Sequence, residues 1–439
     1  MQNRLELRVW EANELPADWS NRTHPLNDEI IKKLEGRVAE IVRLVKNEGD
    51  IALARFAAEF DKAPISTADL RVRKEEIDQA YLNVTEEQVS AIKMLKGRVA
   101  CFEKAMLKQI EVAFTEEGLT VQNMLYPIDS VGCYVPGGQA AYPTTVVMTT
   151  TPAKVAGVPR VVLCSPPDKK GAVNPLVLVA ADICGADEIF KVGGAHAIAA
   201  LAYGTESIKP VRKIVGPGNK YVTVAKMLVS KDVAIDMPAG PSEILVIADE
   251  TANAKYVAAD MISQAEHSED SIAGVITTSR NIANEVVDWL GKLVLGIDRA
   301  ITVIEALSQN GFVIHCETTE EMVTLANAFA PEHLEILARY PMEIADKITT
   351  SGLVLIGPYS PVSLSDYGSG TNHVLPTGGY ARVFSGLSAL DFTRRASVVE
   401  CSRDGLLAFR DHIRVLTQAE NLPNHYRAVE ARFEDERKM

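Results

Sequence analysis

The stretch Glu188-Ile-Phe-Lys-Val192-Gly193-Gly194-Ala-His196 joins a short apolar run to two glycines and then to an alanine-rich segment. The stretch Lys213-Ile-Val-Gly216-Pro-Gly218-Asn219 repeats this form. Apolar runs of this length are typical of buried strands, and each glycine turn leads directly into a helical segment. Strands that alternate with helices predict an α/β architecture with a mostly parallel sheet.

The two glycine turns are candidate sites for an anionic ligand. Bare backbone amides at the positive end of a helix suit the phosphates of a dinucleotide or a carboxylate. Neither turn has the Gly-x-Gly-x-x-Gly spacing of a dinucleotide-binding fingerprint, and either one alone is more often an ordinary tight connection. Their repetition indicates a duplicated nucleotide-binding-like fold.

The sequence on either side extends this organisation. Residues 27–61 have the spacing of amphipathic helices, with a break at Gly49, and the short apolar runs begin near residue 130. The apolar run at 244–248 precedes a helix whose apolar positions, through residue 265, fit one buried face. We expect the opposite face to carry Asp260, Gln264 and His267. Pro423 suits the first turn of a C-terminal amphipathic helix.

The composition is that of a globular protein with several domains. The chain has 439 residues, of which 47% are hydrophobic, and a net charge of -13, which gives no electrostatic footprint for nucleic acid. It has no apolar signal core and no run long enough to span a bilayer, so we expect a cytoplasmic protein. The six cysteines lack zinc-ribbon or dithiol spacing, and we expect reduced, buried thiols. A cysteine nucleophile for aldehyde oxidation is the less favoured alternative.

Several polar residues are candidate metal ligands. Gln264 and His267 lie three positions apart near a predicted helix end, so both can reach one metal ion, although such a pair is more often a solvated helix face. Asp366 lies in the polar segment Ser365-Asp-Tyr-Gly-Ser-Gly-Thr-Asn-His373, which we expect to form a loop at the carboxyl edge of the sheet. Asp366 is an oxygen donor there or a helix cap, and His425 supplies a further nitrogen if the last helix docks nearby. Zinc accepts this set of donors.

The stretch Ala330-Pro-Glu332-His333 sets a carboxylate beside an imidazole after a proline that restrains the backbone. On the surface this pair would be unremarkable. In a pocket, one group could take the proton of an alcohol while the other activates water.

Several long motifs are spread along the chain. They are Val131-Gly-Cys-Tyr134-Val-Pro-Gly-Gly138, Pro152-Ala-Lys-Val-Ala-Gly157, Gly216-Pro-Gly-Asn219, Ile235-Asp-Met-Pro-Ala-Gly-Pro-Ser242-Glu243, Gln264-Ala-Glu-His267, Ala330-Pro-Glu332-His333 and Gly370-Thr-Asn-His373-Val-Leu-Pro. Through these motifs, the chain resembles the histidinol dehydrogenase family over nearly its whole length.

The resemblance implies two incomplete Rossmann-like domains with parallel-sheet cores, plus small N-terminal and C-terminal helical segments. The expected division is an N-terminal arm at 1–25 and a first domain at 26–129 with 242–385, which carries the zinc and catalytic residues. A second, NAD-binding domain follows at 130–241. Residues 386–439 would form a C-terminal helical segment that is exchanged between the subunits of a homodimer.

The resemblance also implies a zinc-dependent, NAD-linked, four-electron oxidation of L-histidinol through L-histidinal to L-histidine, the last step of histidine biosynthesis. His333 would be the general base for the alcohol, and Glu332 would activate water for the aldehyde. Zinc would be held by Gln264, His267, Asp366 and, from the partner subunit, His425. The substrate would lie among Ser242, Gln264, His267, His333, Asp366, His373, Glu420 and His425.

The family's NAD contacts correspond to Tyr134, His196 and Asn219 in this sequence. Many members have glutamine where this chain has His196, and a histidine has a different reach, which puts that contact in doubt. The stretch Ser268-Glu-Asp270 also differs from the glycine or aspartate followed by proline that the family pattern leads us to expect.

Three alternatives remain at this point. The first is a zinc and NAD dehydrogenase of another small polar alcohol, such as a sulfonated propanediol. The second is a zinc hydrolase with purely structural glycine turns, and the third is a non-catalytic metabolite-binding protein on the same fold. Turnover of L-histidinol with appearance of NADH separates all three from the favoured function.

Overall fold

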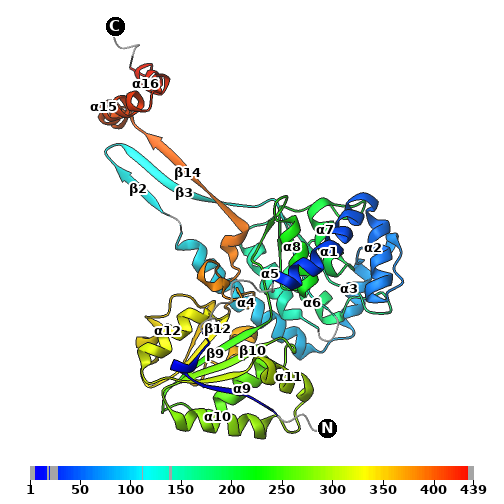
Figure 1. The fold of residues 1–439 in the computed structure, drawn as a ribbon. Coiled ribbons are helices and arrows are strands. Elements are labelled where there is room, and N and C mark those ends of the chain that lie inside the picture. Colours follow the sequence, from blue (N-terminus) through cyan, green and yellow to red (C-terminus); the bar gives the residue numbers. More distant parts are fainter. Residues whose placement is uncertain (1–4, 17–18, 20–27, 111, 138–140, 434–439) are drawn as a thin grey trace.

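The computed structural model describes residues 5–16, 19, 28–110, 112–137 and 141–433. Figure 1 shows two α/β units and a long arm that projects away from them and ends at the C-terminal helices. Each unit is a parallel sheet with helices on both faces, and the arm contains a small antiparallel sheet.

The first unit is a six-stranded parallel sheet with the order β1-β11-β10-β9-β12-β13. Its strands are β1 (Arg8–Glu11), β9 (Glu243–Ala248), β10 (Ile272–Thr277), β11 (Phe312–His315), β12 (His333–Leu337) and β13 (Leu353–Ile356). Apart from β1, the strands follow the 3-2-1-4-5 order of a Rossmann-type sheet. The first strand of the chain is therefore an edge strand of a sheet that otherwise begins at residue 243.

Helices cover both faces of this sheet. One face is covered by α9 (Ala254–Ala265), α10 (Arg280–Leu293) and α11 (Ala300–Asn310), and the other by α12 (Thr319–Phe329) and α13 (Pro341–Ala345). A short helix, α14 (Val362–Tyr367), packs against α9. The central strands β9 and β12 are buried on both sides, as is typical of a parallel sheet that helices cover on both faces.

The second unit is a five-stranded parallel sheet with the order β6-β5-β4-β7-β8, which again is the 3-2-1-4-5 order in chain sequence. Its strands are β4 (Ser130–Tyr134), β5 (Arg160–Cys164), β6 (Glu188–Phe190), β7 (Lys213–Val215) and β8 (Ala234–Ile235). The two glycine turns connect β6 to α7 (Gly194–Tyr203) and β7 towards α8 (Lys220–Val229). The predicted duplicated, Rossmann-like α/β fold is confirmed.

Two groups of helices sandwich the second sheet. One face is covered by α7 and α8 with α1 (Asp28–Glu48), α2 (Asp50–Phe56) and a π-helical turn, η2 (Ala57–Asp61). The other is covered by α3 (Lys74–Tyr81), α4 (Glu86–Lys108), α5 (Pro143–Val155) and α6 (Pro175–Cys184). Short 3-10 helices are also present, namely η1 (Ala12–Glu14), η3 (Thr67–Asp69), η4 (Tyr380–Arg382) and η5 (Ala389–Phe392).

This packing differs from the expected grouping of residues 26–129 with 242–385. The helices at 28–108 share the cores of the second unit, because their apolar faces meet α5, α6, α7 and α8. The expected N-terminal arm also differs in part, since Arg8–Glu11 pairs with β11. Asn27 and Gly138, which the sequence interpretation included, lie outside the described residues.

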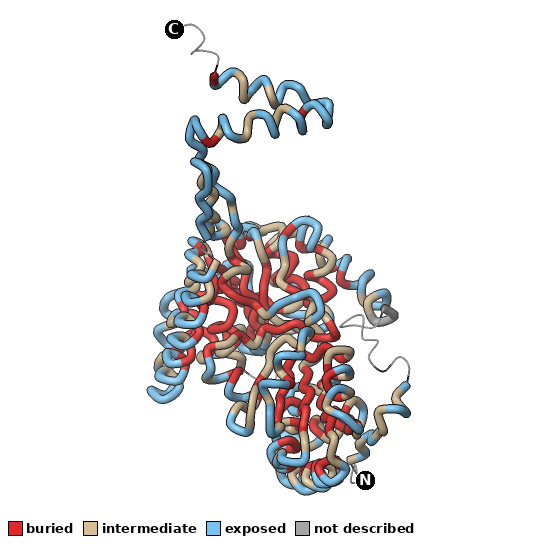
Figure 2. The backbone as a smooth tube through the Cα atoms, turned by 90° about the vertical axis from the view of Figure 1, so that its left-hand side faces the viewer, coloured by how far each residue is buried: buried red, intermediate tan, exposed pale blue. Residues whose placement is uncertain are grey.

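The arm is built from distant parts of the chain. β14 (Thr393–Cys401) pairs antiparallel with β3 (Leu119–Pro127), which pairs with β2 (Ala113–Glu116). At its tip lie α15 (Arg403–Ala419) and α16 (Pro423–Glu430), where Pro423 takes the first helical position as predicted. Figure 2 shows that most of the arm is exposed, in contrast to the two sheets.

Two further expectations concern the chain as a whole. None of the helices in the described part of the chain has the length and apolarity that a bilayer crossing needs. All six cysteines are free, and four are buried, but Cys101 and Cys401 are exposed. The expectation of buried thiols is therefore wrong for these two, because both lie on solvent-facing positions of α4 and of the arm.

Candidate active site

The centre of the candidate site is the pair Glu332 and His333 at the amino end of β12. Both residues are buried, with 6% and 3% of their surface exposed, and His333 Nδ1 lies 3.5 Å from Glu332 Oε2. The predicted carboxylate–imidazole pair therefore lies inside the protein. Ionisable groups are rarely buried, and a buried pair is typical of a functional site.

The neighbouring strand β9 holds both groups in place through Glu243. The backbone amide of Glu243 donates to Glu332 Oε2 at 2.7 Å, and the carbonyl oxygen of Glu243 lies 3.0 Å from His333 Nδ1. The Glu243 side chain in turn accepts from the Gly378 amide at 2.9 Å. Since Nδ1 is occupied, His333 Nε2 is the free ring nitrogen: it is buried and has no hydrogen-bond partner among the described residues.

The charges around His333 alter its affinity for a proton. Burial acts to lower its pKa, but the charges of Glu332 and Asp366 and the hydrogen bonds to Glu332 and the Glu243 carbonyl outweigh burial and raise the pKa to about 9. The imidazole is thus a stronger base than an ordinary histidine.

His373 and Asp366 lie beside this pair. His373 Nδ1 is 3.8 Å from Asp366 Oδ1, and the pKa of His373 is lowered by burial, with the charges of Asp366, His333, Glu332 and His267 all acting on it. Four of the predicted site residues therefore act electrostatically on one imidazole. Asn372 donates to the Met148 carbonyl at 2.8 Å, which ties the segment that carries His373 to helix α5 of the second unit.

The predicted edge of the sheet is wrong. The segment 365–373 was expected to form a loop at the carboxyl edge, but Ser365 and Asp366 belong to helix α14, and the cluster lies at the amino ends of β9 and β12. The reason is the path of the chain after β13, because α14 and the residues up to His373 return towards the edge where β12 begins.

The prediction that Gln264 lies on the polar face of α9 is also wrong. Gln264 is 1% exposed and lies on the buried face of the helix, whereas His267 is exposed just beyond the helix end. An amide buried in this way needs partners that a solvated face would not supply. Its burial argues against a surface role.

Two of the predicted site residues do not join the cluster within one chain. Glu420 and His425 are exposed at the tip of the arm, and Figure 1 shows α16 far from β12 and α9. Ser242, by contrast, directly precedes Glu243 at the amino end of β9 and its carbonyl accepts from the Ile272 amide. Within the described residues, no three His, Cys, Asp or Glu side chains form a metal-binding group.

Sequence reasoning missed a link between two carboxyl groups near the cluster, the buried Glu335 and the half-buried Asp260. Glu335 of β12 accepts from the Val362 amide at 2.8 Å, at the start of the helix that carries Asp366. Asp260 of α9 interacts electrostatically with Glu335, and burial raises the pKa of Asp260 to about 6 and that of Glu335 well above its usual range. The available signal was a glutamate inside an otherwise apolar strand.

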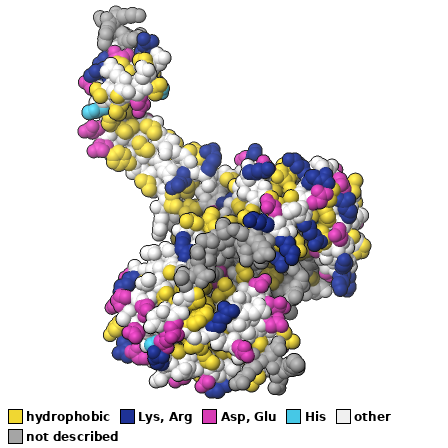
Figure 3. Space-filling view, viewed as in Figure 1, with side chains coloured by type: hydrophobic (Ala, Val, Ile, Leu, Met, Phe, Trp, Pro, Cys, Tyr) yellow, Lys and Arg dark blue, Asp and Glu magenta, His cyan; other side chains and the backbone are white. Residues whose placement is uncertain are grey.

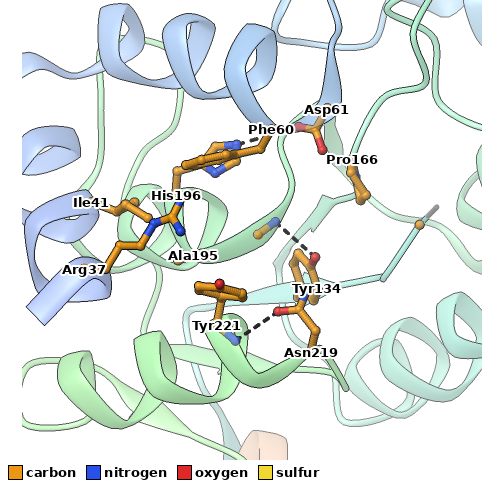
Figure 4. A pocket seen from close by; sticks show the side chains of 12 residues that line it. Arg37, Ile41, Phe60, Asp61, Tyr134, Pro166, Ala195, His196, Asn219 and Tyr221 are labelled. Atoms are coloured by element: carbon orange, nitrogen blue, oxygen red, sulfur yellow. Dashed lines mark hydrogen bonds and ion pairs between the residues drawn. The ribbon is translucent and has the colours of Figure 1, made fainter. Parts of the chain in front are cut away.

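A second candidate site is a pocket of about 330 Å³ at the carboxyl edge of the second sheet. Tyr134, His196 and Asn219 all line it, so the structure brings the three predicted NAD contacts together. Figure 4 shows Tyr134, Asn219 and Tyr221 on one wall and Arg37, Phe60 and His196 opposite. The position beyond the carboxyl ends of β4 and β7 is the switch point where Rossmann-type sheets bind nucleotides.

The two glycine turns shape this pocket. The Gly194 amide donates to the Tyr134 hydroxyl at 3.1 Å, and the Asn219 side chain accepts from the first amides of α8. Gly216 has a φ of +117°, and a Cβ there would overlap the Tyr134 carbonyl oxygen, so only glycine fits. A buried ion pair between Lys226 and Asp236 braces the same turn, because both side chains hydrogen-bond the backbone of Gly216.

The fold and the two sites define an α/β enzyme of the dehydrogenase type, with a buried carboxylate–imidazole cluster on one Rossmann-like sheet and a pocket at the carboxyl edge of the other. A family model described as histidinol dehydrogenase matches residues 26–433. The chain therefore belongs to the histidinol dehydrogenase family, the oxidoreductases that carry out the last step of histidine biosynthesis.

Individual relatives agree with this placement. The chain is 42% identical over 400 residues to a histidinol dehydrogenase of Methanothermobacter thermautotrophicus, covering 91% of this chain and 93% of the relative. It is 44% identical to that of Methanocaldococcus jannaschii, over 97% of this chain and 98% of the relative. The crystal structure of histidinol dehydrogenase from Elizabethkingia anophelis superposes with a TM-score of 0.91 at 37% identity, covering 98% and 99% of the two chains.

Proposed function

We propose that this chain catalyses the zinc-dependent, NAD-linked oxidation of L-histidinol through L-histidinal to L-histidine. The observation that carries the proposal is the buried pair Glu332–His333, in which one ring nitrogen is held by the Glu243 carbonyl and the other is unpartnered among the described residues. Alcohol oxidation needs a positioned base, and aldehyde oxidation needs an activated water, so the two residues suit the two steps.

His333 is the base of the first oxidation. Its Nδ1–H donates to the Glu243 carbonyl, which leaves the lone pair of Nε2 to accept the hydroxyl proton of the substrate. As that proton moves to Nε2, the carbinol carbon loses a hydride and the alcohol becomes an aldehyde. NAD, when bound, supplies the hydride acceptor for both oxidations.

Glu332 serves the second oxidation. Its Oε2 is fixed by the Glu243 amide at 2.7 Å, so the carboxylate has a set orientation inside the site. The carboxylate accepts a proton from water as the water oxygen bonds to the aldehyde carbon and the carbonyl oxygen takes the negative charge, which gives the mono-anion of the hydrate. Loss of a second hydride from this hydrate yields the carboxylic acid, and the site must retain the aldehyde until then.

The residues fit a zinc ion. Gln264, His267 and Asp366 offer an amide oxygen, an imidazole and a carboxylate, which are ligands that zinc accepts. Because Gln264 is buried, water cannot satisfy its polar atoms. We place these three with His425 of the partner subunit as the ligands. Zinc, when bound, supplies an anchor for the imidazole and amine of the substrate. Ser242, His333, His373 and the arm residue Glu420 complete the substrate contacts in this proposal.

In this proposal, the substrate and NAD bind to different units. Zinc, substrate and the catalytic pair belong to the first unit, and NAD belongs to the pocket of the second, with contacts from Tyr134, His196 and Asn219. The strand-to-helix turns of this pocket bring the N-termini of α7 and α8 to the same edge of the sheet, which favours an anionic group such as a dinucleotide phosphate.

The arm supports a homodimer in which α15 and α16 reach the partner. Its strands and helices expose large apolar side chains, and Figure 3 shows apolar atoms along the arm. They include Val112, Phe114, Met124, Val399, Leu407, Val415, Leu416 and Leu422. An exposed apolar surface on a slender arm is typical of an interface. A second copy would cover it and deliver His425 and Glu420 to the cluster of the other chain.

We also place the protein in the cytoplasm. The six free cysteines, four of them buried, suit a reducing compartment. Fractionation of cells that express the tagged chain tests this placement directly.

The decisive experiment measures product stoichiometry. The purified enzyme should form two NADH for each L-histidinol consumed, lose this activity with a chelator and regain it with zinc. Turnover of a sulfonated propanediol in preference to L-histidinol would overturn the substrate, and cleavage of an ester or amide without NADH formation would overturn the reaction class.

A further inference from the structure

One corner of the pocket in the second unit contains buried polar atoms without partners. Asp61 ends the π-helical turn η2, and its Oδ2 lies 4.0 Å from His196 Nε2. Asp61 Oδ2 and both ring nitrogens of His196 are buried and have no hydrogen-bond partner among the described residues. His196 is 1% exposed, and Figure 4 shows both side chains at the pocket. Such atoms need a ligand to satisfy them.

The chemistry of the two groups restricts that ligand. Burial raises the pKa of Asp61 to about 6, so the carboxylate is mostly ionised at neutral pH and only accepts hydrogen bonds. Burial lowers the pKa of His196 to about 3, so the ring is neutral, with one donor and one acceptor. Hydroxyl groups, which donate and accept, satisfy both residues. A phosphate would be repelled by the negative charge of the carboxylate.

The surroundings identify which hydroxyls these are. The Phe60 ring lies 6.0 Å from the His196 ring, and the Arg37 guanidinium lies 5.8 Å from the rings of both Phe60 and Tyr221. Aromatic and guanidinium planes bind a purine by stacking. Figure 1 places α2, which leads into η2, at the side of the second unit away from β12. The nicotinamide must reach the base at β12, so this corner faces the adenosine end.

We propose that the Asp61 carboxylate, with His196 beside it, binds the ribose hydroxyls at the adenosine end of NAD and thereby selects NAD over NADP. The inference rests on the proposed use of NAD. An acidic residue on the ribose 2′-hydroxyl is a general device of Rossmann-type sites, and here the acid comes from a helix of the N-terminal segment and not from the second strand.

Titration of the protein fluorescence with NADH and with NADPH tests the proposal without turnover. We expect the unchanged enzyme to bind NADH at least about 100-fold more tightly than NADPH, because a buried carboxylate opposes the 2′-phosphate. Asp61→Asn removes the charge and should weaken NADH binding about tenfold while NADPH binding stays equal or improves. Asp78→Asn is the matched control: this exposed carboxylate pairs with Lys74 on α3, and its loss should change neither affinity.

The outcomes separate the inference from the function it rests on. If the unchanged enzyme binds neither dinucleotide, the proposed NAD-linked function fails. If it binds NADH but Asp61→Asn weakens NADH and NADPH equally, the effect is structural and the inference alone fails. The inference alone also fails if Asp61→Asn binds NADH and NADPH as tightly as the unchanged enzyme does.

A second pair of variants tests His196 and keeps the proposal falsifiable if Asp61→Asn misfolds. His196→Gln retains one donor and one acceptor and should keep NADH affinity within about threefold, whereas His196→Leu removes both and should lose about tenfold. Equal affinities in the two variants would show that the ring is only packing, and would overturn its part in the site.

Discussion

His333 presents Nδ1 to the carbonyl oxygen of Glu243 at 3.0 Å, and this contact decides which ring nitrogen is free. Because a neutral imidazole carries one proton, a donating Nδ1–H leaves Nε2 as the acceptor. The strand that precedes α9 thus sets the tautomer of the residue that we propose as the base.

The first prediction concerns that base. His333→Asn should slow oxidation of L-histidinol by about 10² to 10⁴, because positioned proton transfer contributes that much. Stopped-flow absorbance of the first NADH measures it. His315→Asn is the control, since His315 lies on β11 and pairs with Glu11, away from the cluster. A His333→Asn enzyme that reduced NAD at the unchanged rate would refute the assignment.

The second prediction separates the two half-reactions. Glu332→Gln should mainly impair the oxidation of L-histidinal, again by about 10² or more, because the amide cannot accept the proton of water. Supplying L-histidinal and L-histidinol in parallel assays measures each step alone. Equal losses in both steps for Glu332→Gln and His333→Asn would contradict the proposed division of labour.

The third prediction is a pH dependence. The pKa of His333 is raised to about 9, so the ring is protonated at neutral pH and becomes a base as the pH rises. The first oxidation should accelerate about tenfold per pH unit below 8.5 and level off above 9. The stability that this raised pKa contributes is present below about pH 6.5 and is lost as the pH rises through about 9. A flat profile from pH 7 to 9 would show that another group is the base.

The fourth prediction concerns metal removal. A chelator should weaken the binding of L-histidinol far more than that of NAD, because three of the proposed zinc ligands belong to the first unit and the fourth to the arm, whereas the proposed NAD contacts belong to the second unit. Calorimetric titration of each ligand into the apo and zinc-loaded enzyme measures the difference. Loss of NAD binding with substrate binding retained would reverse the assignment of the two units.

Much of the fold was predictable because the sequence pattern is local there. The runs before Gly193 and Gly216 are strands, and the helices after them begin where the glycines allow the backbone to turn. The pair Glu332 and His333 was found from its proline-restrained neighbourhood, and the structure confirms its burial.

The missed features depend on contacts between distant segments. Asp366 and His373 lie at the amino edge because the chain after β13 turns back, and no local signal specifies that path. Asp61 lines the pocket of the second unit because α1 and α2 pack on α7 and α8, which periodicity alone does not reveal. Gln264 is buried by packing, although the helical pattern places it on the polar face of the helix.

The last prediction tests whether the arm completes the site of another chain. His425 lies at the tip of the arm, far from β12 in the same chain, so a site that includes it must take it from a second subunit. We therefore mix two inactive variants, His333→Asn and His425→Ala, after each has been shown to dimerise, and let the subunits exchange. In a mixed dimer, one site combines both defects and the other combines an intact His333 with an intact His425. Random exchange makes half of the dimers mixed, so activity should return to about one quarter of that of the unchanged enzyme. Each variant mixed with itself is the control. If His425 acted within its own chain, every site would keep one defect and the mixture would stay inactive.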